Sequence, residues 1–218
     1  MYSRRPREGF GLQPRPKPLK RPAQARAKFT VQAIYDAFVR IWQRDGWERL
    51  TTRSVALETG VSVGTLYEYF PNKQALLSGY VRHCVESLVA ALAQRPIDLA
   101  RVVRLTCDPR AQGLPPFDAK MLNLEHEIAE PKHHRRAYDE VLAAWRGALA
   151  AAGCGADPQR IEALFVAAWG GRRYLLLAQP PLTAQAWVEQ MQAVCTAALA
   201  VPAASAALTG SPSPSGRD

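Results

Sequence analysis

Apolar residues recur at helical spacing along most of the chain. Between Val31 and Trp42 they fall every three or four positions, which is the period of one buried helix face. No run of alternating apolar and polar residues is long enough to predict a strand. The pattern therefore predicts an all-α protein, whose first helix is capped by Thr30 and ends near Asp45-Gly46.

Caps and helix-breaking residues delimit three further helices, expected over residues 52–59, 63–70 and 73–93. The first of them is closed by Gly60, and Pro71 stops the second. The capping residues are Thr51, Ser62 and Asn72. Two short helices joined by a tight glycine turn are typical of a helix-turn-helix.

Beyond Pro96, breaks rich in glycine and proline separate five more helices. We expect them over residues 97–107, 117–130, 132–152, 158–179 and 183–201. The last two are apolar on almost every side, so each needs neighbours on most sides, and a second copy of the chain is the simplest supplier. Gly170-Gly171, inside an apolar run, is expected to permit close helix approach.

Within residues 51–73, one set of side chains is spaced to pack the two short helices against the first helix. This set is Val55, Ala56, Val61, Leu66 and Phe70. The second short helix then turns Thr65, Tyr67, Glu68 and Tyr69 outward. Exposed tyrosines beside a threonine are suited to base edges and phosphates.

The helix starts in this segment add groups that suit a nucleic acid. Val63 and Gly64 lie in a first turn that has little bulk and free amides, so a duplex can approach it closely. Hydroxyl, amide and guanidinium groups suited to phosphate oxygens come from Thr51, Thr52 and Arg53. Lys73 opens the long helix, where its charge and the helix dipole both favour an anion.

At these residues the chain resembles the TetR-type (tetracycline-repressor-like) transcriptional regulators. The shared pattern is Thr-Thr-Arg at a helix start, Gly-Val-Ser at the turn, Gly-Thr-Leu-Tyr-x-Tyr-Phe, and then x-Asn-Lys-x-x-Leu-Leu, within residues 30–80. The resemblance implies a three-helix DNA-binding domain, a connecting fourth helix, and an all-helical effector-binding body that dimerises through its last two long helices.

The resemblance also assigns contacts. Those expected to hold the DNA backbone are Thr51, Thr52, Arg53, Ser62, Tyr69 and Lys73. Those expected nearest the bases are Val63, Gly64, Thr65 and Tyr67. Glu68 departs from the aromatic residue that many members place there and is left out of the contact set. The implied domains are a DNA-binding domain over 29–72 and an effector-binding and dimerisation domain over 73–201.

Charge changes this picture at the N-terminus. Of a net charge of +9, residues 1–28 account for +8, with nine lysines and arginines against Glu8, and they also hold five prolines. This composition predicts a flexible basic arm, which either follows a polyphosphate or only keeps the protein dissolved. Residues 202–218, rich in Ser, Pro, Ala and Gly, are expected to form a disordered tail.

The remaining composition excludes several classes. No segment has the roughly 20 apolar residues that a bilayer requires, and no secretory signal opens the chain, so we expect a cytoplasmic protein. Four cysteines and four histidines lack the spacing of metal or redox motifs, so no metal and no cofactor are predicted. Large apolar side chains either line an effector cavity or form plain core: Phe117, Met121, Trp145, Phe165 and Trp169.

These features together predict a ligand-responsive repressor that binds a partly palindromic DNA operator as a homodimer and responds to an unidentified small molecule. Two other regulatory functions fit the same residues: a DNA-bound scaffold for a protein partner and a transcriptional activator. An enzyme that carries a helix-turn-helix would need an acid, base or nucleophile constellation, and the sequence offers none.

Overall fold

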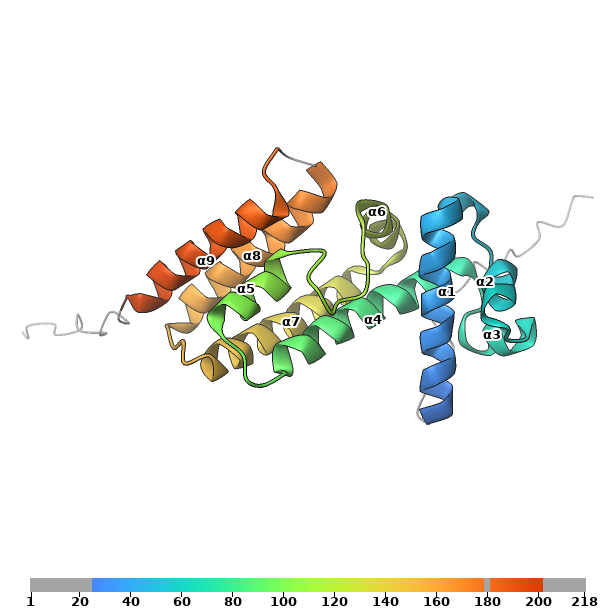
Figure 1. Ribbon diagram of the computed structural model, residues 1–218, viewed down its shortest axis with the longest axis horizontal. Helices are drawn as coiled ribbons and strands as arrows, with labels where there is room; N and C mark the ends of the chain where they lie inside the picture. Colours follow the sequence, from blue (N-terminus) through green and yellow to red (C-terminus); the bar gives the residue numbers. More distant parts are fainter. Residues whose placement is uncertain (1–24, 179–180, 202–218) are drawn as a thin grey trace, which may run out of the picture. The chain divides into compact units, whose positions relative to one another are not determined.

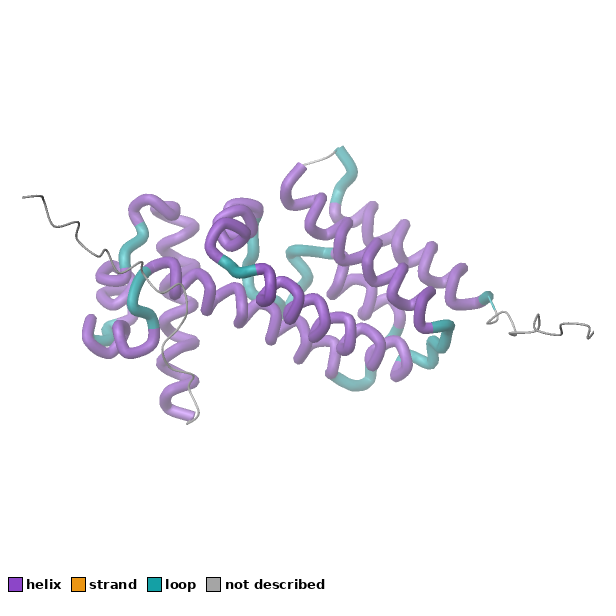
Figure 2. Tube along the Cα trace, turned by 180° about the vertical axis from the view of Figure 1, so that it is seen from behind, coloured by secondary structure: helices purple, strands orange, loops and turns teal. Residues whose placement is uncertain are grey.

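The computed structural model describes residues 25–178 and 181–201, and every regular element in these ranges is a helix (Figures 1 and 2). The prediction of an all-α fold is therefore confirmed. The helices are α1 (Ala25–Arg49), α2 (Thr52–Thr59), α3 (Val63–Tyr69), α4 (Lys73–Ala93), α5 (Leu99–Cys107), α6 (Ala119–Ile128), α7 (Pro131–Ala151), α8 (Pro158–Ala178) and α9 (Ala184–Ala200).

The described chain forms two compact units. The first contains residues up to 88 together with 113–138, and the second contains 89–112 and the residues from 139 onward. The segment predicted as the DNA-binding domain, 29–72, lies wholly in the first unit. Helices α4 and α7 each supply residues to both units.

Helix α1 starts earlier than its sequence pattern indicates. It begins at Ala25, so Thr30 lies inside the helix and its hydroxyl donates to the carbonyl of Arg26 at 3.0 Å, the i−4 bond of a helical threonine. The expectation that Thr30 caps this helix is wrong, and so is the extension of a flexible arm to residue 28. Residues 1–24 of that arm and the expected tail, 202–218, lie outside the described residues.

The far end of α1 bends where the glycine was expected to end it. Gly46 has φ 74 and ψ 175, a conformation that residues with a side chain adopt at a cost, and helical structure resumes as far as Arg49. The bend precedes Trp47 and Leu50, which are both buried in the core of the first unit.

The core of the first unit joins α1 to the helix-turn-helix. Ile34, Phe38 and Ile41 on one face of α1 are almost fully buried, and they share a hydrophobic cluster with Val55 of α2 and Leu66 of α3. Each large side chain buried in this way stabilises the fold by about 1.5–3 kcal/mol. The sequence prediction that these elements pack together is confirmed.

Hydrogen bonds fix α6 within the same unit. One carboxylate oxygen of Asp118 accepts from the backbone amide of Met121 at 2.8 Å, capping α6, and the other accepts from Trp42 Nε1 at 2.7 Å. The hydroxyl of Tyr80 in α4 donates to the carbonyl of Pro116 at 2.5 Å. These bonds hold the start of α6 against α1 and α4.

Buried tyrosines predict how the stability of this core depends on pH. Burial raises the pKa of both Tyr35 and Tyr80 well above 10. The unfolded chain therefore releases these protons above about pH 10, whereas the folded chain keeps them. Stability is complete below that pH and should fall above it by about 1.4 kcal/mol per pH unit for each tyrosine. Urea unfolding at pH 9, 10 and 11 measures this slope.

Tyr35→Phe keeps the ring but removes the ionising hydroxyl. The loss of stability per pH unit above pH 10 should therefore become smaller by the contribution of one tyrosine, about 1.4 kcal/mol per pH unit. Phe29→Tyr, which adds a tyrosine at an exposed position of α1, serves as the control and should leave the slope as it is. An unchanged slope in Tyr35→Phe would show that the Tyr35 hydroxyl already ionises in the folded protein.

In the second unit, α5 packs against both α8 and α9, and α8 lies beside α9 (Figure 1). Gly171 of α8 faces Trp187 of α9: a Cβ atom at Gly171 would lie 2.0 Å from a carbon of the indole ring. At the neighbouring Gly170 nothing lies within 4 Å of such an atom. The prediction that this glycine pair permits close helix approach is thus confirmed, and Gly171 is the residue responsible.

Candidate nucleic-acid interface

The helix-turn-helix is defined by the caps that the sequence predicted. The Thr51 hydroxyl accepts from the amide of Ser54 at 3.0 Å, and the Ser54 hydroxyl oxygen accepts from the amide of Thr51 at 3.1 Å, which completes a capping box at the start of α2. Gly60 ends α2 in the left-handed conformation, with φ 72. Ser62 then starts α3 by accepting from the amide of Thr65 at 3.0 Å.

The exposed side of α3 forms a small surface, which we call the α3 surface and define as Ser62, Val63, Gly64, Thr65 and Tyr67. Val63 is 40% exposed and Tyr67 is 44% exposed, so two large side chains of a seven-residue helix face solvent. Ser62 and Gly64 are also exposed, and Thr65 is half-buried. The predicted base contacts of Val63, Gly64, Thr65 and Tyr67 and the predicted backbone contact of Ser62 stay predictions.

Gly64 has no steric role in the folded chain. A Cβ atom at this position would contact only the hydroxyl oxygen of Ser62, at an ordinary 3.7 Å. A glycine within a helix costs about 0.5–1 kcal/mol relative to alanine. Since the chain's own packing does not require the missing side chain, the bare backbone suits close approach by something outside the chain.

Two of the predicted contact residues are buried. Thr52 is 9% exposed, and its hydroxyl donates to the hydroxyl oxygen of Tyr67 at 3.1 Å, so this side chain orients Tyr67. Tyr69 is 7% exposed and belongs to the core cluster together with Leu66 and Phe70. The expectation that Tyr69 turns outward is therefore wrong: it lies three residues after Leu66, on the same helix face.

The two basic residues that flank this surface, Arg53 and Lys73, differ in exposure and in contacts. Arg53, in the first turn of α2, is exposed. Lys73, the first residue of α4, is half-buried: its Nζ lies 4.4 Å from the ring centroid of Trp47 and donates to the backbone carbonyl of Trp47 at 3.2 Å. An ammonium group carries three donors, so Lys73 is held in place by one of them without losing its capacity for an anion.

The outer side of α2 is attached to α1 by ion pairs. Arg40 Nε donates to Glu58 Oε1 at 3.1 Å, and Arg44 lies 3.4 Å from the other carboxylate oxygen of Glu58. The hydrogen bond from Arg40 lowers the pKa of Glu58, so the carboxylate stays ionised at neutral pH. These exposed pairs set the orientation of α2 more than they stabilise it.

The predicted effector-lining residues lie in two different units. Met121 is 2% exposed and Phe117 half-buried, and both pack on the core of the first unit. Trp145 and Phe165 are fully buried in the second unit with ring centroids 6.1 Å apart, and Trp169 stacks on Phe165 at 6.0 Å. Their role in binding an effector stays a prediction.

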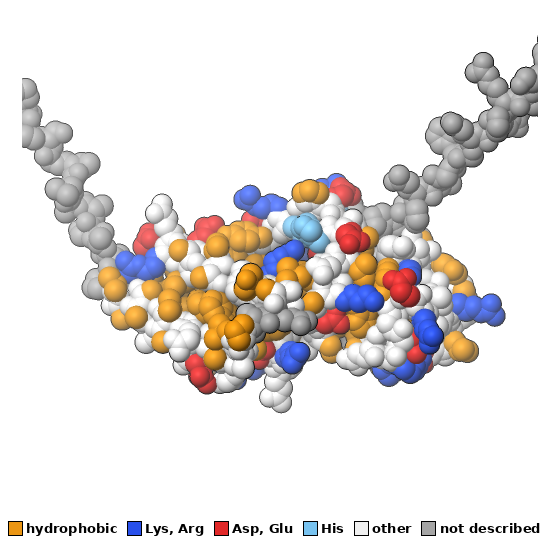
Figure 3. All heavy atoms as spheres, turned by 90° about the horizontal axis from the view of Figure 1, so that it is seen from above, with side chains coloured by type: hydrophobic (Ala, Val, Ile, Leu, Met, Phe, Trp, Pro, Cys, Tyr) orange, Lys and Arg blue, Asp and Glu red, His pale blue; other side chains and the backbone are white. Residues whose placement is uncertain are grey.

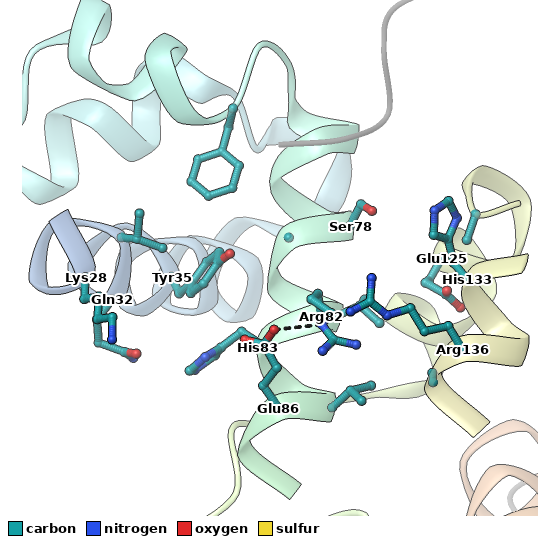
Figure 4. Close-up of a pocket in the computed structure, with 17 residues that line it drawn as sticks. Lys28, Gln32, Tyr35, Ser78, Arg82, His83, Glu86, Glu125, His133 and Arg136 are labelled. Carbon is teal, nitrogen blue, oxygen red and sulfur yellow. Dashed lines mark hydrogen bonds and ion pairs between the residues drawn. The ribbon is translucent and has the colours of Figure 1, made fainter. Parts of the chain in front are cut away.

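The sequence pattern missed a cavity of about 560 Å³ in the first unit (Figure 4). Its lining comes from α1, α4, α6 and α7 and from Phe70, the C-cap of α3. It combines apolar side chains with ionisable ones, among them Lys28, Arg82, Glu86 and Arg136. These residues lie far apart along the chain, so no local motif marks them.

Neither a metal site nor a membrane-spanning helix is found in the described residues. Within 25–178 and 181–201, no three His, Cys, Asp or Glu side chains come together as metal ligands. No helix in those ranges has both the length and the apolar character needed to cross a bilayer.

Residues 34–79 match the family model of bacterial regulatory proteins of the tetR family. No curated protein matches the chain in sequence. The fold is similar to that of a TetR transcription regulator from Haloarcula marismortui, with a TM-score of 0.59 and 16% identity, covering 79% of this chain and 97% of that one. A transcriptional regulator from Rhodococcus sp. Rha1 gives a TM-score of 0.53 and 18% identity, covering 78% and 95%.

A third structure of similar fold is the complex of SmeT with triclosan. It gives a TM-score of 0.50 and 17% identity and covers 87% of this chain and all of SmeT. At these identities the similarity to the three solved structures concerns the arrangement of the helices alone. The match to the family model, over residues 34–79, spans the helix-turn-helix.

Proposed function

We propose that this chain, whose residues 34–79 are a TetR-family DNA-binding domain within the fold of TetR-family regulators, is a ligand-responsive transcriptional repressor without enzymatic activity. It acts in the cytoplasm, binds a partly palindromic DNA operator as a homodimer, and releases the operator when a small molecule binds. The observation that carries the proposal is the α3 surface, where a bare glycine backbone lies between exposed Val63 and Tyr67.

The α3 surface has the parts that a major-groove contact needs. Tyr67 is oriented by Thr52, and Val63 and Gly64 leave the first turn of α3 accessible. We assign base contacts to Val63, Gly64, Thr65 and Tyr67. Thr51, Arg53 and Lys73 lie at helix starts, where they hold phosphate oxygens that fix the register of the protein on the duplex.

Dimer formation is supported by an exposed apolar face on α8 and α9 (Figure 3). On α8, Val166, Tyr174 and Leu177 recur at helical spacing, and on α9, Val194 is half exposed. Several large exposed apolar side chains on two neighbouring helices are typical of a protein interface. A symmetric pair would present two α3 surfaces to successive turns of the duplex. The SmeT–triclosan complex supports response to a small molecule in this fold.

Selection of bound duplexes from a random-sequence library tests the proposal. We expect recovery of a sequence with two-fold symmetry, because each protomer of a homodimer reads one half-site. Recovery of no preferred sequence would overturn the proposed function.

On the selected duplex, Lys73→Ala and Tyr67→Ala should behave differently. Lys73→Ala should weaken binding to all sequences similarly and make the salt dependence shallower by about one unit, because one phosphate is no longer neutralised. Tyr67→Ala should change the ranking of sequences, since it alters a base-facing residue. Fluorescence anisotropy at several salt concentrations measures both effects.

Lys120→Ala, at an exposed position on α6, is the control that removes one positive charge away from the α3 surface. If Lys73→Ala and Tyr67→Ala both bind like the unaltered protein, the DNA contacts are assigned to the wrong residues.

A further inference from the structure

We propose that the cavity of the first unit is a binding site for a small organic anion, in which an apolar body carries a carboxylate or phosphate group. The site lies within one unit and is built from α1, α4, α6, α7 and the C-cap of α3. It deepens the proposed function, since it gives the effector a location and a chemical class, and its effect on DNA rests on that function.

Two arginines converge in this cavity. Arg136 reaches from α7 toward Arg82 on α4, and both line the same space (Figure 4). Arg82 also donates from Nε to Glu86 Oε1 at 2.8 Å, which directs its guanidinium group. A guanidinium group carries five N–H donors, so Arg82, which gives one of them to Glu86, and Arg136 can both also donate to an anion placed between them.

The charge balance favours an anion over a cation. Lys28, Arg82 and Arg136 bring three positive charges to the lining, against the carboxylates of Glu86 and Glu125. Arg82 and Glu86 pair with each other and cancel, which leaves Lys28 and Arg136 against Glu125, a net charge of +1 on the lining with His83 and His133 counted as neutral. Glu125 is almost fully buried and lies 3.5 Å from His134. A cationic ligand would therefore meet a net positive wall, whereas an anion is attracted by it.

The apolar part of the lining argues for an organic body. Val31 and Tyr35 of α1, Phe70, and Val81 and Val85 of α4 border the same cavity. At about 560 Å³, the cavity has the size of a small-molecule site and exceeds what an inorganic phosphate fills. The ligand therefore needs an apolar body of one or two rings, or a short acyl chain, behind its charged group.

A ligand in this cavity would touch the helix-turn-helix itself. Phe70 ends α3, and Tyr35 packs against Phe70 with ring centroids 5.6 Å apart, in the core that holds α2 and α3 on α1. An anion that binds two positions of these helices with different affinity shifts the population between them, and the affinity for DNA changes by the same factor.

Calorimetric titration of the full chain without DNA tests the site directly. The probes are 2-naphthoate, decanoate and phenyl phosphate, with 2-naphthamide as the neutral counterpart of the first. We expect at least one anion to bind more tightly than about 1 mM, and 2-naphthamide to bind more weakly than 2-naphthoate.

Arg136→Gln should weaken the binding of that anion about tenfold, because one charge-assisted hydrogen bond is removed. Arg135→Gln is the matched control: it removes the same charge from the adjacent exposed position of α7, outside the lining. Ala137→Phe fills the cavity while keeping every charge, and should abolish binding. Circular dichroism verifies that each variant is folded.

Three outcomes would overturn the site: no binding of any of the three anions, equal loss of affinity in Arg136→Gln and Arg135→Gln, or unchanged binding in Ala137→Phe. Each can be found in a protein that still selects a symmetric DNA sequence, in which case the proposed function stands and the anion site fails. Conversely, anion binding without DNA selection would keep the site and remove its regulatory role.

Discussion

Replacing Gly64 with leucine should lower the affinity for the selected duplex by about 10- to 100-fold and leave the stability of the protein equal or slightly higher. A Cβ atom at Gly64 meets only the Ser62 hydroxyl at 3.7 Å, and the position is exposed, so the folded chain accommodates the side chain. On DNA, the same side chain keeps the first turn of α3 away from the groove. Weaker readout of the base edges at this turn costs about 1–3 kcal/mol of binding free energy.

Gly147→Leu is the matched control for this change. Gly147 is likewise an exposed glycine inside a helix, but it lies on α7 in the second unit, and nothing lies within 4 Å of a Cβ atom added there. Fluorescence anisotropy with the selected duplex and thermal melting are measured for both variants. Equal DNA affinity of Gly64→Leu and the unaltered protein would show that α3 does not approach the duplex through its first turn.

The helix-turn-helix was predictable because its signals are local. Thr51, Gly60 and Ser62 each act on backbone groups within three residues, so the sequence pattern contains everything that sets these helix ends. The start of α1 was not predictable, because a threonine such as Thr30 is as compatible with a helix interior as with a cap. What decides is whether the residues before it are helical, and the prolines nearby gave the opposite expectation.

Tyr69 shows where a local pattern gives the wrong face. An aromatic residue near the end of a short helix can turn to either side. The sequence pattern turned Tyr69 outward together with Thr65 and Tyr67, but Tyr69 lies three residues after Leu66 and is buried on the same helix face. The cavity was beyond sequence reasoning for a different reason. Lys28, Arg82 and Arg136 come to line one cavity only through the packing of three helices, which no spacing along the chain expresses.

Replacing Gly171 with alanine should destabilise the protein by about 3 kcal/mol, an effect at the upper end of overpacking changes. The added methyl group would lie 2.0, 2.5 and 2.9 Å from three carbons of the Trp187 ring. Those atoms belong to a rigid indole whose nitrogen is buried, so the ring moves as one body and α9 must shift with it. Urea unfolding measures the loss of stability, and Gly147→Ala, at an open helical position, should instead raise stability slightly.

A double-mutant cycle assigns this cost to the Trp187 ring. In a Trp187→Ala background the clash is gone, so Gly171→Ala should cost nothing and even gain about 0.5–1 kcal/mol from the higher helix propensity of alanine. If Gly171→Ala costs the same in both backgrounds, the strain arises elsewhere on α8. Because α8 and α9 also carry the exposed apolar face proposed for dimer formation, a shift of α9 should weaken DNA binding as well. The clash would then act on DNA binding through the dimer interface, far from the α3 surface in sequence. If the clash with Trp187 causes both the loss of stability and the loss of DNA binding, Gly171→Ala should produce neither in the Trp187→Ala background.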